Sequence, residues 1–346
     1  MANILASFVY EFLDFNGLNN NEYPCLLKIT NKKKNIFSYP ILKNPIEFKN
    51  NKFLVGQLPL TNKSSGGKNR LGFSGLTQDK TYYYASSFNS IYQIRKKNLS
   101  LKKIISNQLM SDMHGIQIHK KKLFHVLTGL DTVVITNLDG SIIDFFTITK
   151  RLNILRDQSL LKNDWRFIHK KHKGASGFFH INFISVNDSK IWLTSRNLNS
   201  FIVVDLDKNS VELRTMNMMT TSLIHDGIHT NKSIYLTSVN GKIIEVLKKK
   251  EKKREQSYKR DLIIRKITNI DKNIIKGTTN WCRGIEIKKN RIFVMINGRY
   301  ETRPEFSILE VNKKNMKLIN RHTLSYKKLS MKFKLRYLTG FDILVD

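Results

Sequence analysis

A short unit of sequence recurs along most of this chain, and it limits the possible folds more than any other feature. Each copy begins with a polar residue, usually followed by glycine, and continues as three short runs of Ile, Val, Phe, Tyr and Thr separated by polar turns. Such runs are typical of β-strands, and long amphipathic helical patterns are nearly absent. The repeats therefore predict an all-β fold made of similar small sheets. The clearest copies are residues 74–94, 114–140, 180–207, 225–246 and 283–311.

The two ends of the chain indicate how these sheets are arranged. The last copy, residues 339–346, stops after its first strand, while strand-like segments remain at the beginning, at 4–12, 23–30 and 35–40. We expect these three segments to be the outer strands of the sheet whose innermost strand is 338–345. A sheet shared by both ends of the chain closes a ring, and closure leaves only short, protected strand edges.

Counting first strands gives six sheets and hence a six-bladed β-propeller, with first strands at 75, 115, 181, 226, 284 and 340. A β-sandwich or a two-domain all-β chain is the alternative, since regularly spaced strands suit those folds too. We expect one propeller domain over residues 1–346. Its parts are the outer strands of the closing blade in 1–42, a connection in 43–70, and blades in 71–346 with insertions at 151–177 and 248–260.

The chain is strongly basic, because 60 Lys and Arg against 27 Asp and Glu leave a formal net charge of +33. Such a balance first suggests nucleic acid or an anionic membrane surface as the partner. The lysines, however, lie in small groups at predicted turns, as an AT-rich genome would also supply them, and no nucleic-acid-binding motif accompanies them. We therefore do not expect nucleic acid to be the main partner. The densest basic run, residues 248–260, is either a short helix or a solvated insertion.

The chain has the composition of a protein with a real core, since 40% of its residues are hydrophobic. Two cysteines are too few for a disulfide framework or a four-thiolate zinc site. The first residues have no basic start, and Glu11 and Asp14 interrupt them where a secretory signal would be apolar. No stretch approaches the ~20 apolar residues of a membrane span. We expect a soluble, cytoplasmic protein.

The residues at the heads of the innermost strands are the main candidates for a functional site, because in a propeller they surround one mouth of the central channel. Three of the six are histidine, although the chain has only nine histidines. Three neutral imidazoles with an open position suit a divalent metal such as zinc, iron or calcium. A metal-free polar ligand site and a merely structural channel are the alternatives. The six residues are Ser74, His114, His180, His225, Arg283 and Thr339.

Other polar residues near these heads have weaker claims. Arg283 would lie on the rim, where a guanidinium can hold an anionic ligand by two parallel hydrogen bonds. Asn182 follows His180 by two positions and is a candidate for binding substrate or for a structural turn. Asp112 could accept a hydrogen bond from an imidazole. Asp226 directly follows a histidine, so strand alternation predicts that it faces the other side and is a poor ligand.

The insertion at 151–177 precedes the third blade, and by propeller geometry it should pass over the same mouth. It contains Trp165 and Arg166, and an aromatic ring beside cations suits an anionic or sugar-like ligand. The alternative is a solvated loop that Trp165 anchors by packing.

The repeats resemble the broad group of six-bladed propellers that includes NHL-repeat proteins, the senescence-marker or gluconolactonase type and the strictosidine-synthase type. The resemblance covers roughly residues 71–346 and rests on stretches such as HGIQI, DTVVITNLDG and HDGIHT. It implies the fold. Some propellers of the wider group use channel histidines with a metal or as acid–base residues. The gluconolactonase type uses Glu, Asn and Asp ligands, whose carboxylates are not matched at the aligned positions.

The leading interpretation is an enzyme-like site of lyase or hydrolase type. In it His114, His180 and His225 gather a metal or a polarised group, and Arg283 takes a small anionic or sugar-like ligand. The alternative is a non-catalytic recognition module that binds a protein, a glycan or an anionic surface through its top loops and basic rim.

Overall fold

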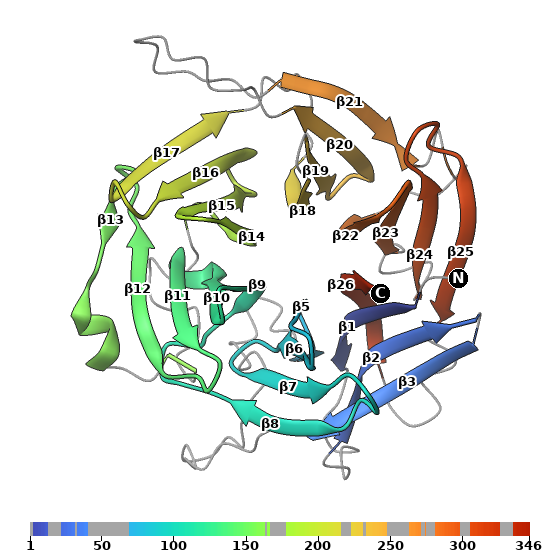
Figure 1. Cartoon of the computed structure of the whole chain (residues 1–346), viewed down its shortest axis with the longest axis horizontal. Coiled ribbons are helices and arrows are strands. Elements are labelled where there is room, and N and C mark those ends of the chain that lie inside the picture. The colour runs from blue at the N-terminus through green and yellow to red at the C-terminus, as the bar shows by residue number, and fades with distance from the viewer. Residues whose placement is uncertain are drawn as a thin grey trace.

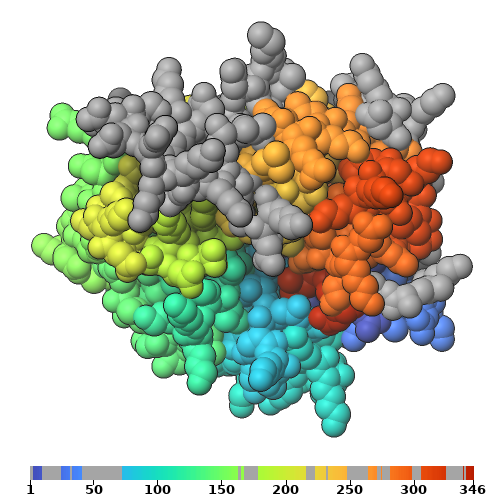
Figure 2. Space-filling model, turned by 45° about the horizontal axis from the view of Figure 1, so that its top comes forward, coloured from blue at the N-terminus to red at the C-terminus, as the bar shows by residue number. Residues whose placement is uncertain are grey.

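The computed structural model contains six antiparallel sheets arranged as blades around a central axis (Figure 1). The predicted six-bladed, all-β propeller is therefore confirmed. Figure 2 shows the blades following one another around the molecule in chain order. The structure describes residues 3–12, 22–31, 33–40, 69–162, 165–166, 178–215, 223–230, 233–247, 263–270, 274, 281–297, 305–325 and 335–346.

Each blade has its first strand at the axis and later strands progressively further out. Blade 1 contains β5 (Gly75–Gln78), β6 (Tyr82–Ser86), β7 (Ile91–Arg95) and β8 (Leu101–Ile105). Blade 2 contains β9 (Met113–His119), β10 (Lys122–Leu127), β11 (Thr132–Asn137), β12 (Ile142–Ile148) and β13 (Ile154–Leu155). Blade 3 contains β14 (Ile181–Asn187), β15 (Lys190–Ser195), β16 (Ser200–Asp205) and β17 (Ser210–Thr215).

The remaining blades follow the same order. Blade 4 contains β18 (Ile224–His229), β19 (Ser233–Ser238), β20 (Lys242–Leu247) and β21 (Ile263–Asn269). Blade 5 contains β22 (Trp281–Lys288), β23 (Arg291–Asn297), β24 (Glu305–Asn312) and β25 (Leu318–Ser325). Blade 6 contains β26 (Leu335–Val345), β1 (Ile4–Phe12), β2 (Glu22–Thr30) and β3 (Lys33–Pro40).

The repeat unit predicted three strands, whereas each blade has a fourth strand further out, and blade 2 also has a fifth. In β17, for example, exposed and half-buried residues alternate, and no residue is fully buried. One face of such a strand is in water and carries polar and charged residues. In the sequence, the strand is therefore hard to tell from the polar turns beside it.

Blade 6 closes the ring as predicted, because β26 from the end of the chain pairs with β1 from the beginning. Their antiparallel register runs from Ile4↔Val345 to Phe12↔Leu335. A further strand, β4 (Asn69–Gly72), pairs with the second half of β1, and the sequence did not indicate it. Most of the predicted connection at 43–70 and the whole basic run at 248–260 lie outside the described residues, as do 163–164 and 167–177 of the predicted insertion at 151–177.

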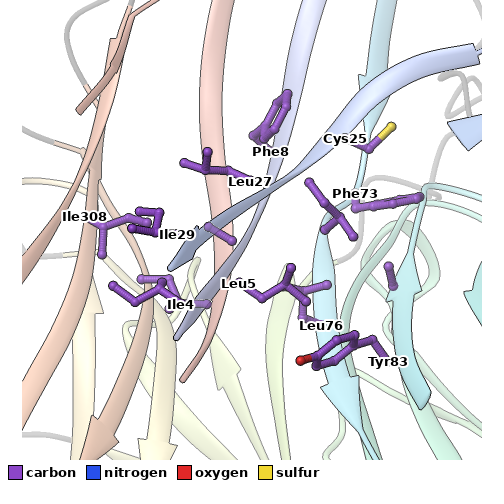
Figure 3. Close-up of a cluster of buried hydrophobic side chains, with 14 of the residues drawn as sticks. Ile4, Leu5, Phe8, Cys25, Leu27, Ile29, Phe73, Leu76, Tyr83 and Ile308 are labelled. Carbon is purple, nitrogen blue, oxygen red and sulfur yellow. The ribbon is translucent and has the colours of Figure 1, made fainter. Parts of the chain in front are cut away.

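A single hydrophobic cluster joins the closing blade to its neighbours on both sides. Figure 3 shows Ile4, Leu5 and Phe8 of β1 among side chains of blades 5, 6 and 1. Phe8 is fully buried, and its ring centroid lies 5.9 Å from that of Phe306 in blade 5. Burial of this apolar surface stabilises the closed ring. No helix in the described part of the chain is long and apolar enough to cross a membrane.

Phe8→Ala should lower the free energy of unfolding by about 3–5 kcal/mol, because it leaves a cavity in the closing core. Phe178→Ala is the matched control, since this ring is 46% exposed. We expect that change to stay within about 0.5 kcal/mol of wild type. Denaturant unfolding measures both variants, and equal losses would contradict the closing role of Phe8.

His125 predicts an acid-sensitive stability. Its side chain in β10 is fully buried, and neither ring nitrogen has a hydrogen-bond partner among the described residues. Burial lowers the pKa of His125 from 6.5 to about 3. Below pH 6.5 the unfolded chain therefore binds a proton at this residue that the native state does not bind, and the native state loses stability. His125→Leu should therefore gain about 2 kcal/mol relative to wild type between pH 8 and pH 5. Urea unfolding at both pH values tests this, and a pH-independent difference would refute it.

Candidate functional site

Three imidazoles that are far apart in the sequence come together beside the central channel. The ring centroid of His114 lies 6.2 Å from that of His180 and 6.5 Å from that of His225. His114 and His225 are buried near the beginnings of β9 and β18, and His180 immediately precedes β14. The structure thus shows the convergence that the repeat predicted. We call these three histidines and Arg283 the mouth cluster.

A β-bulge at the same place in blades 2, 3 and 4 shapes the heads of their innermost strands. In each blade the pairing between the first two strands skips just after one pair, namely Met113↔Leu127, Ile181↔Ser195 and Ile224↔Ser238. The residues that follow these pairs are His114, Asn182 and His225. Asn182 is therefore the structural counterpart of the two buried histidines, and His180 lies two positions earlier. The repeat alignment is corrected in this blade.

Asp226 does not face away from its neighbour, so the prediction from strand alternation was wrong. Its Oδ1 accepts a hydrogen bond from His225 Nδ1 at 2.9 Å, and its Oδ2 accepts one from the main-chain N–H of Gly284 at 3.0 Å. The bulge interrupts the alternation and allows adjacent side chains to meet. Asp226 therefore orients His225 and connects blade 4 to blade 5.

His114 has a comparable arrangement. Its Nδ1 lies 3.2 Å from the main-chain carbonyl oxygen of Asp112 and 3.9 Å from the carboxylate of the same residue. Asp112 thus accepts the hydrogen bond through its main-chain carbonyl, while its carboxylate is too far away for a direct hydrogen bond. The Nδ1 atoms of His114 and His225 each face an oxygen that has no proton to donate. Nδ1 is therefore the protonated nitrogen in each neutral ring. Nε2 then has the lone pair.

All three imidazoles are neutral near pH 7. Burial lowers the pKa of His114 to about 4, where the Asp112 carboxylate opposes the shift and the Arg283 guanidinium adds to it. Burial, together with the nearby His114, lowers the pKa of His180 to about 3. Burial and Arg283 also hold the pKa of His225 below its ordinary value, although Asp226 raises it. The cluster therefore offers uncharged bases beside a permanent cation.

Arg283 is that cation, and aromatic rings hold it in place. Its guanidinium carbon lies 3.8 Å from the centroid of the Phe341 ring and 4.5 Å from that of the Trp281 ring. The residue is only 4% exposed. Stacking on aromatic faces replaces part of the hydration that a guanidinium loses on burial. A desolvated cation in this position attracts an anion more strongly than a surface arginine does.

Asp131 positions His180, and the sequence analysis missed it. His180 has a left-handed backbone conformation, with φ of 50°. The Asp131 carboxylate accepts a hydrogen bond from the main-chain N–H of the preceding Phe179 at 2.9 Å. In the next turn of chain, Ile181 O accepts a hydrogen bond from Thr128 Oγ1 at 2.6 Å. In sequence, Asp131 looks like any other acidic turn residue, so no signal identified this role.

A cavity of about 440 Å³ runs along the channel next to the mouth cluster, and the innermost strands of all six blades line it. His114 and Asn182 are among the residues that line it, together with Asp226, Glu286 and Asp342. Burial raises the pKa of Glu286 to about 7 and that of Asp342 to about 8, and the charge of Asp226 adds to the latter shift. Glu286 and Asp342 were not among the predicted site residues, because they lie further along the strands than the heads that the repeat singles out.

Trp165 and Arg166 attach the insertion to the segment between β8 and β9. Trp165 Nε1 donates to Leu160 O at 2.7 Å, and its ring packs against the buried cluster of blades 1 and 2. Arg166 Nη1 donates to Ser106 Oγ at 3.2 Å. These are the contacts expected of the anchoring alternative.

The histidines were also predicted to hold a metal. Within the described ranges, no group of three or more His, Cys, Asp or Glu side chains is arranged so that it could hold a metal ion. Two of the imidazoles also have their Nδ1 engaged with protein oxygens, which fits acid–base residues as well as metal ligands. The metal stays a prediction.

The electrostatics of the mouth cluster can be tested by NMR of the histidine rings. At pH 7 we expect His114 and His225 to be neutral Nδ1–H tautomers, with His114 titrating near pH 4. Arg283→Gln should raise the pKa of both rings, since it removes the cation that lowers them. Arg156→Gln is the control, because Arg156 pairs with Asp144 on the exposed side of blade 2. Titration of both rings near pH 6.5 in the wild type would contradict this description.

The fold also has counterparts among solved structures. A chain in the crystal structure of a nidogen–laminin complex is 9% identical, with a TM-score of 0.54, covering 99% of this chain and 98% of that one. The Cps50 (Swd1) β-propeller domain of Myceliophteria thermophila is 8% identical, covering 72% of this chain and 85% of that one (TM-score 0.47). The Pan2 WD40 domain of Neurospora crassa is 11% identical, covering 72% and 65% (TM-score 0.42). No family model matches this sequence, and no curated protein matches it. The first likeness supports the propeller fold alone.

Proposed function

We propose that the mouth cluster is an acid–base site for a small anionic substrate, with Arg283 as the anion-binding residue and His225 as the general base. The observation that carries this proposal is the 2.9 Å hydrogen bond from His225 Nδ1 to Asp226. It leaves Nε2 of His225 as the basic nitrogen and places a carboxylate beside the imidazolium that forms when the base takes a proton. The second bond of Asp226, to Gly284 N, fixes the carboxylate in that position.

Arg283 and His225 would act in sequence. The guanidinium is one of the groups that hold the pKa of His225 low, so the imidazole is a weak base while the site is empty. A carboxylate or phosphate bound to Arg283 offsets this charge and raises the pKa of the imidazole towards its ordinary value. The base therefore becomes stronger when the substrate is in place.

The chemistry proposed is of lyase or hydrolase type. In a lyase reaction, His225 Nε2 takes a proton from the carbon next to the substrate carboxylate, and Arg283 stabilises the negative charge that develops there. A carbon–carbon double bond then forms as the bond from the neighbouring carbon to its oxygen substituent breaks, and the leaving oxygen takes the proton from the His225 imidazolium. In a hydrolase reaction, the same nitrogen takes a proton from an attacking water, whose oxygen bonds to the reacting carbon while the leaving oxygen departs and takes that proton. Neither step needs a metal. We also propose kinship with the NHL, gluconolactonase and strictosidine-synthase group, on the sequence resemblance stated above.

Binding can be tested separately from turnover. Calorimetry with D-glucuronate, using methyl β-D-glucoside as the neutral counterpart, should show saturable binding of the anion alone. Arg283→Gln should weaken this binding at least tenfold, whereas dialysis against EDTA should not change it. Anion binding that requires a stoichiometric metal would favour the metal-site alternative instead.

Turnover of oligogalacturonate can be followed by mass spectrometry, because hydrolysis products gain a water and elimination products do not. His225→Gln should reduce the rate by about 10²–10⁴-fold while leaving anion binding in place, since a positioned base contributes a factor of that size. Binding that is never followed by turnover, with this and related acidic glycans, would favour the recognition module.

A further inference from the structure

Acidic residues line the cavity along the channel, although the molecule as a whole is strongly basic. Lys and Arg make up 60 of the 346 residues, yet neither occurs among the residues that line the cavity. Three carboxylates do, from the innermost strands of blades 4, 5 and 6 in turn. The opposite arc, from blades 1 to 3, presents amide and hydroxyl groups such as those of Thr77, Gln117 and Asn182.

Hydrogen bonds hold all three carboxyl groups in place, and most of the donors are main-chain N–H groups. Asp342 accepts N–H groups from Leu76 at 2.7 Å and from Ile343 at 2.8 Å. Glu286 accepts the N–H of Ile287 at 2.9 Å, and Asp226 has the two bonds described above. These bonds fix where the carboxyl groups lie. Because burial raises the pKa of Glu286 to about 7 and that of Asp342 to about 8, both groups are partly protonated near neutral pH, and a bound cation would favour their ionised forms. The carboxylates also repel one another, which the raised pKa of Asp342 reflects after the larger effect of burial.

Asn182 is an independent sign that something polar occupies the cavity. It is 1% exposed, it belongs to the cavity wall, and neither its Oδ1 nor its Nδ2 has a hydrogen-bond partner among the described residues. Leaving a buried amide unpaired costs about 1–3 kcal/mol per group. A cationic ligand with N–H donors would donate a hydrogen bond to the amide oxygen and also balance the negative charge of the carboxylates.

We propose that this cavity binds a small organic ammonium ion, with Asp226, Glu286 and Asp342 facing its charge and Asn182 accepting one of its N–H groups. A bare metal ion is a poorer fit, because no three of the described acidic or imidazole groups are arranged to coordinate one. The volume of about 440 Å³ is that of a cavity for a small molecule rather than for a single ion.

The cavity and the mouth cluster share Asp226. One of its oxygens accepts the His225 proton, and the residue also forms part of the cavity wall. An ammonium ion near Asp226 would offset part of the negative charge that raises the pKa of His225. Occupation of the cavity should therefore shift the His225 ring signals, whether or not the mouth cluster is catalytic.

The test uses 1,4-diaminobutane as the probe and 1,4-butanediol as its neutral counterpart, with the full chain at pH 7.5 in about 0.15 M salt, where long-range charge effects are screened. We expect calorimetry to show saturable one-to-one binding of the diamine and none of the diol. Binding should also release protons, because the cation favours ionised Glu286 and Asp342. The measured heat should then depend on the ionisation enthalpy of the buffer. His114 and His229 also face the cavity, so their ring signals should be followed in the same titration.

Glu286→Gln should weaken diamine binding at least tenfold and reduce the proton release. Asp342→Asn should do the same, but it is the riskier variant because this side chain also holds Leu76 of blade 1. Asp188→Asn is the control, since this carboxylate is 84% exposed on the turn after β14. The variant should bind the diamine with the affinity of the wild type. The proposal is overturned if the diol binds as well as the diamine, if calcium displaces the diamine at equal concentration, if Glu286→Gln binds as wild type does, or if no binding is seen at millimolar diamine.

Discussion

A closed ring of hydrogen bonds between neighbouring blades is the interaction on which the rest of the structure depends. At each of the six junctions, a side chain of one blade forms a hydrogen bond with the main chain at the innermost strand of the next blade, at distances between 2.6 and 3.0 Å. Hydrophobic burial between blades is non-directional, so it does not by itself fix the position of one strand along the axis relative to the next. These hydrogen bonds fix that position. The pairs are Ser74 with Met113, Thr128 with Ile181, Thr194 with His225, Asp226 with Gly284, Asn297 with Gly340, and Asp342 with Leu76.

Close approach of the innermost strands is a condition for this ring, and it explains why glycine recurs near their heads. A Cβ at Gly115 would lie 2.7 Å from the carbonyl oxygen of Asn182 in the next blade, and one at Gly75 would lie 2.4 Å from that of His114. Side chains would push the strands apart at the level where the ring bonds form. The polar residue followed by glycine, which marked the repeats in the sequence, is therefore a packing requirement as much as a functional signature.

The fold was predictable because its determinants are local and repeated, whereas much of the site was not. Strand runs, turn residues and unmatched terminal segments sufficed for six blades and for closure by both ends of the chain. The convergence of His114 and His225 followed from their common place in the repeat. The partner role of Asp226 did not, because it depends on a bulge that breaks strand alternation. Asn182 was a candidate for the wrong reason, since its equivalence to the histidines appears only in the strand register.

Some residues therefore belong both to the ring of hydrogen bonds and to the candidate site. Acidic and basic groups occupy different places along the axis. Asp226 and Asp342 bond to the next blade and line the cavity, while Arg283 lies beside the imidazoles, stacked on Phe341. A basic exterior with a net charge of +33 surrounds this axis, but charges beyond about 8–10 Å are largely screened in physiological salt. Local geometry thus sets the character of each layer: a desolvated guanidinium lies at the mouth, and acidic residues line the cavity. The overall composition predicts neither arrangement.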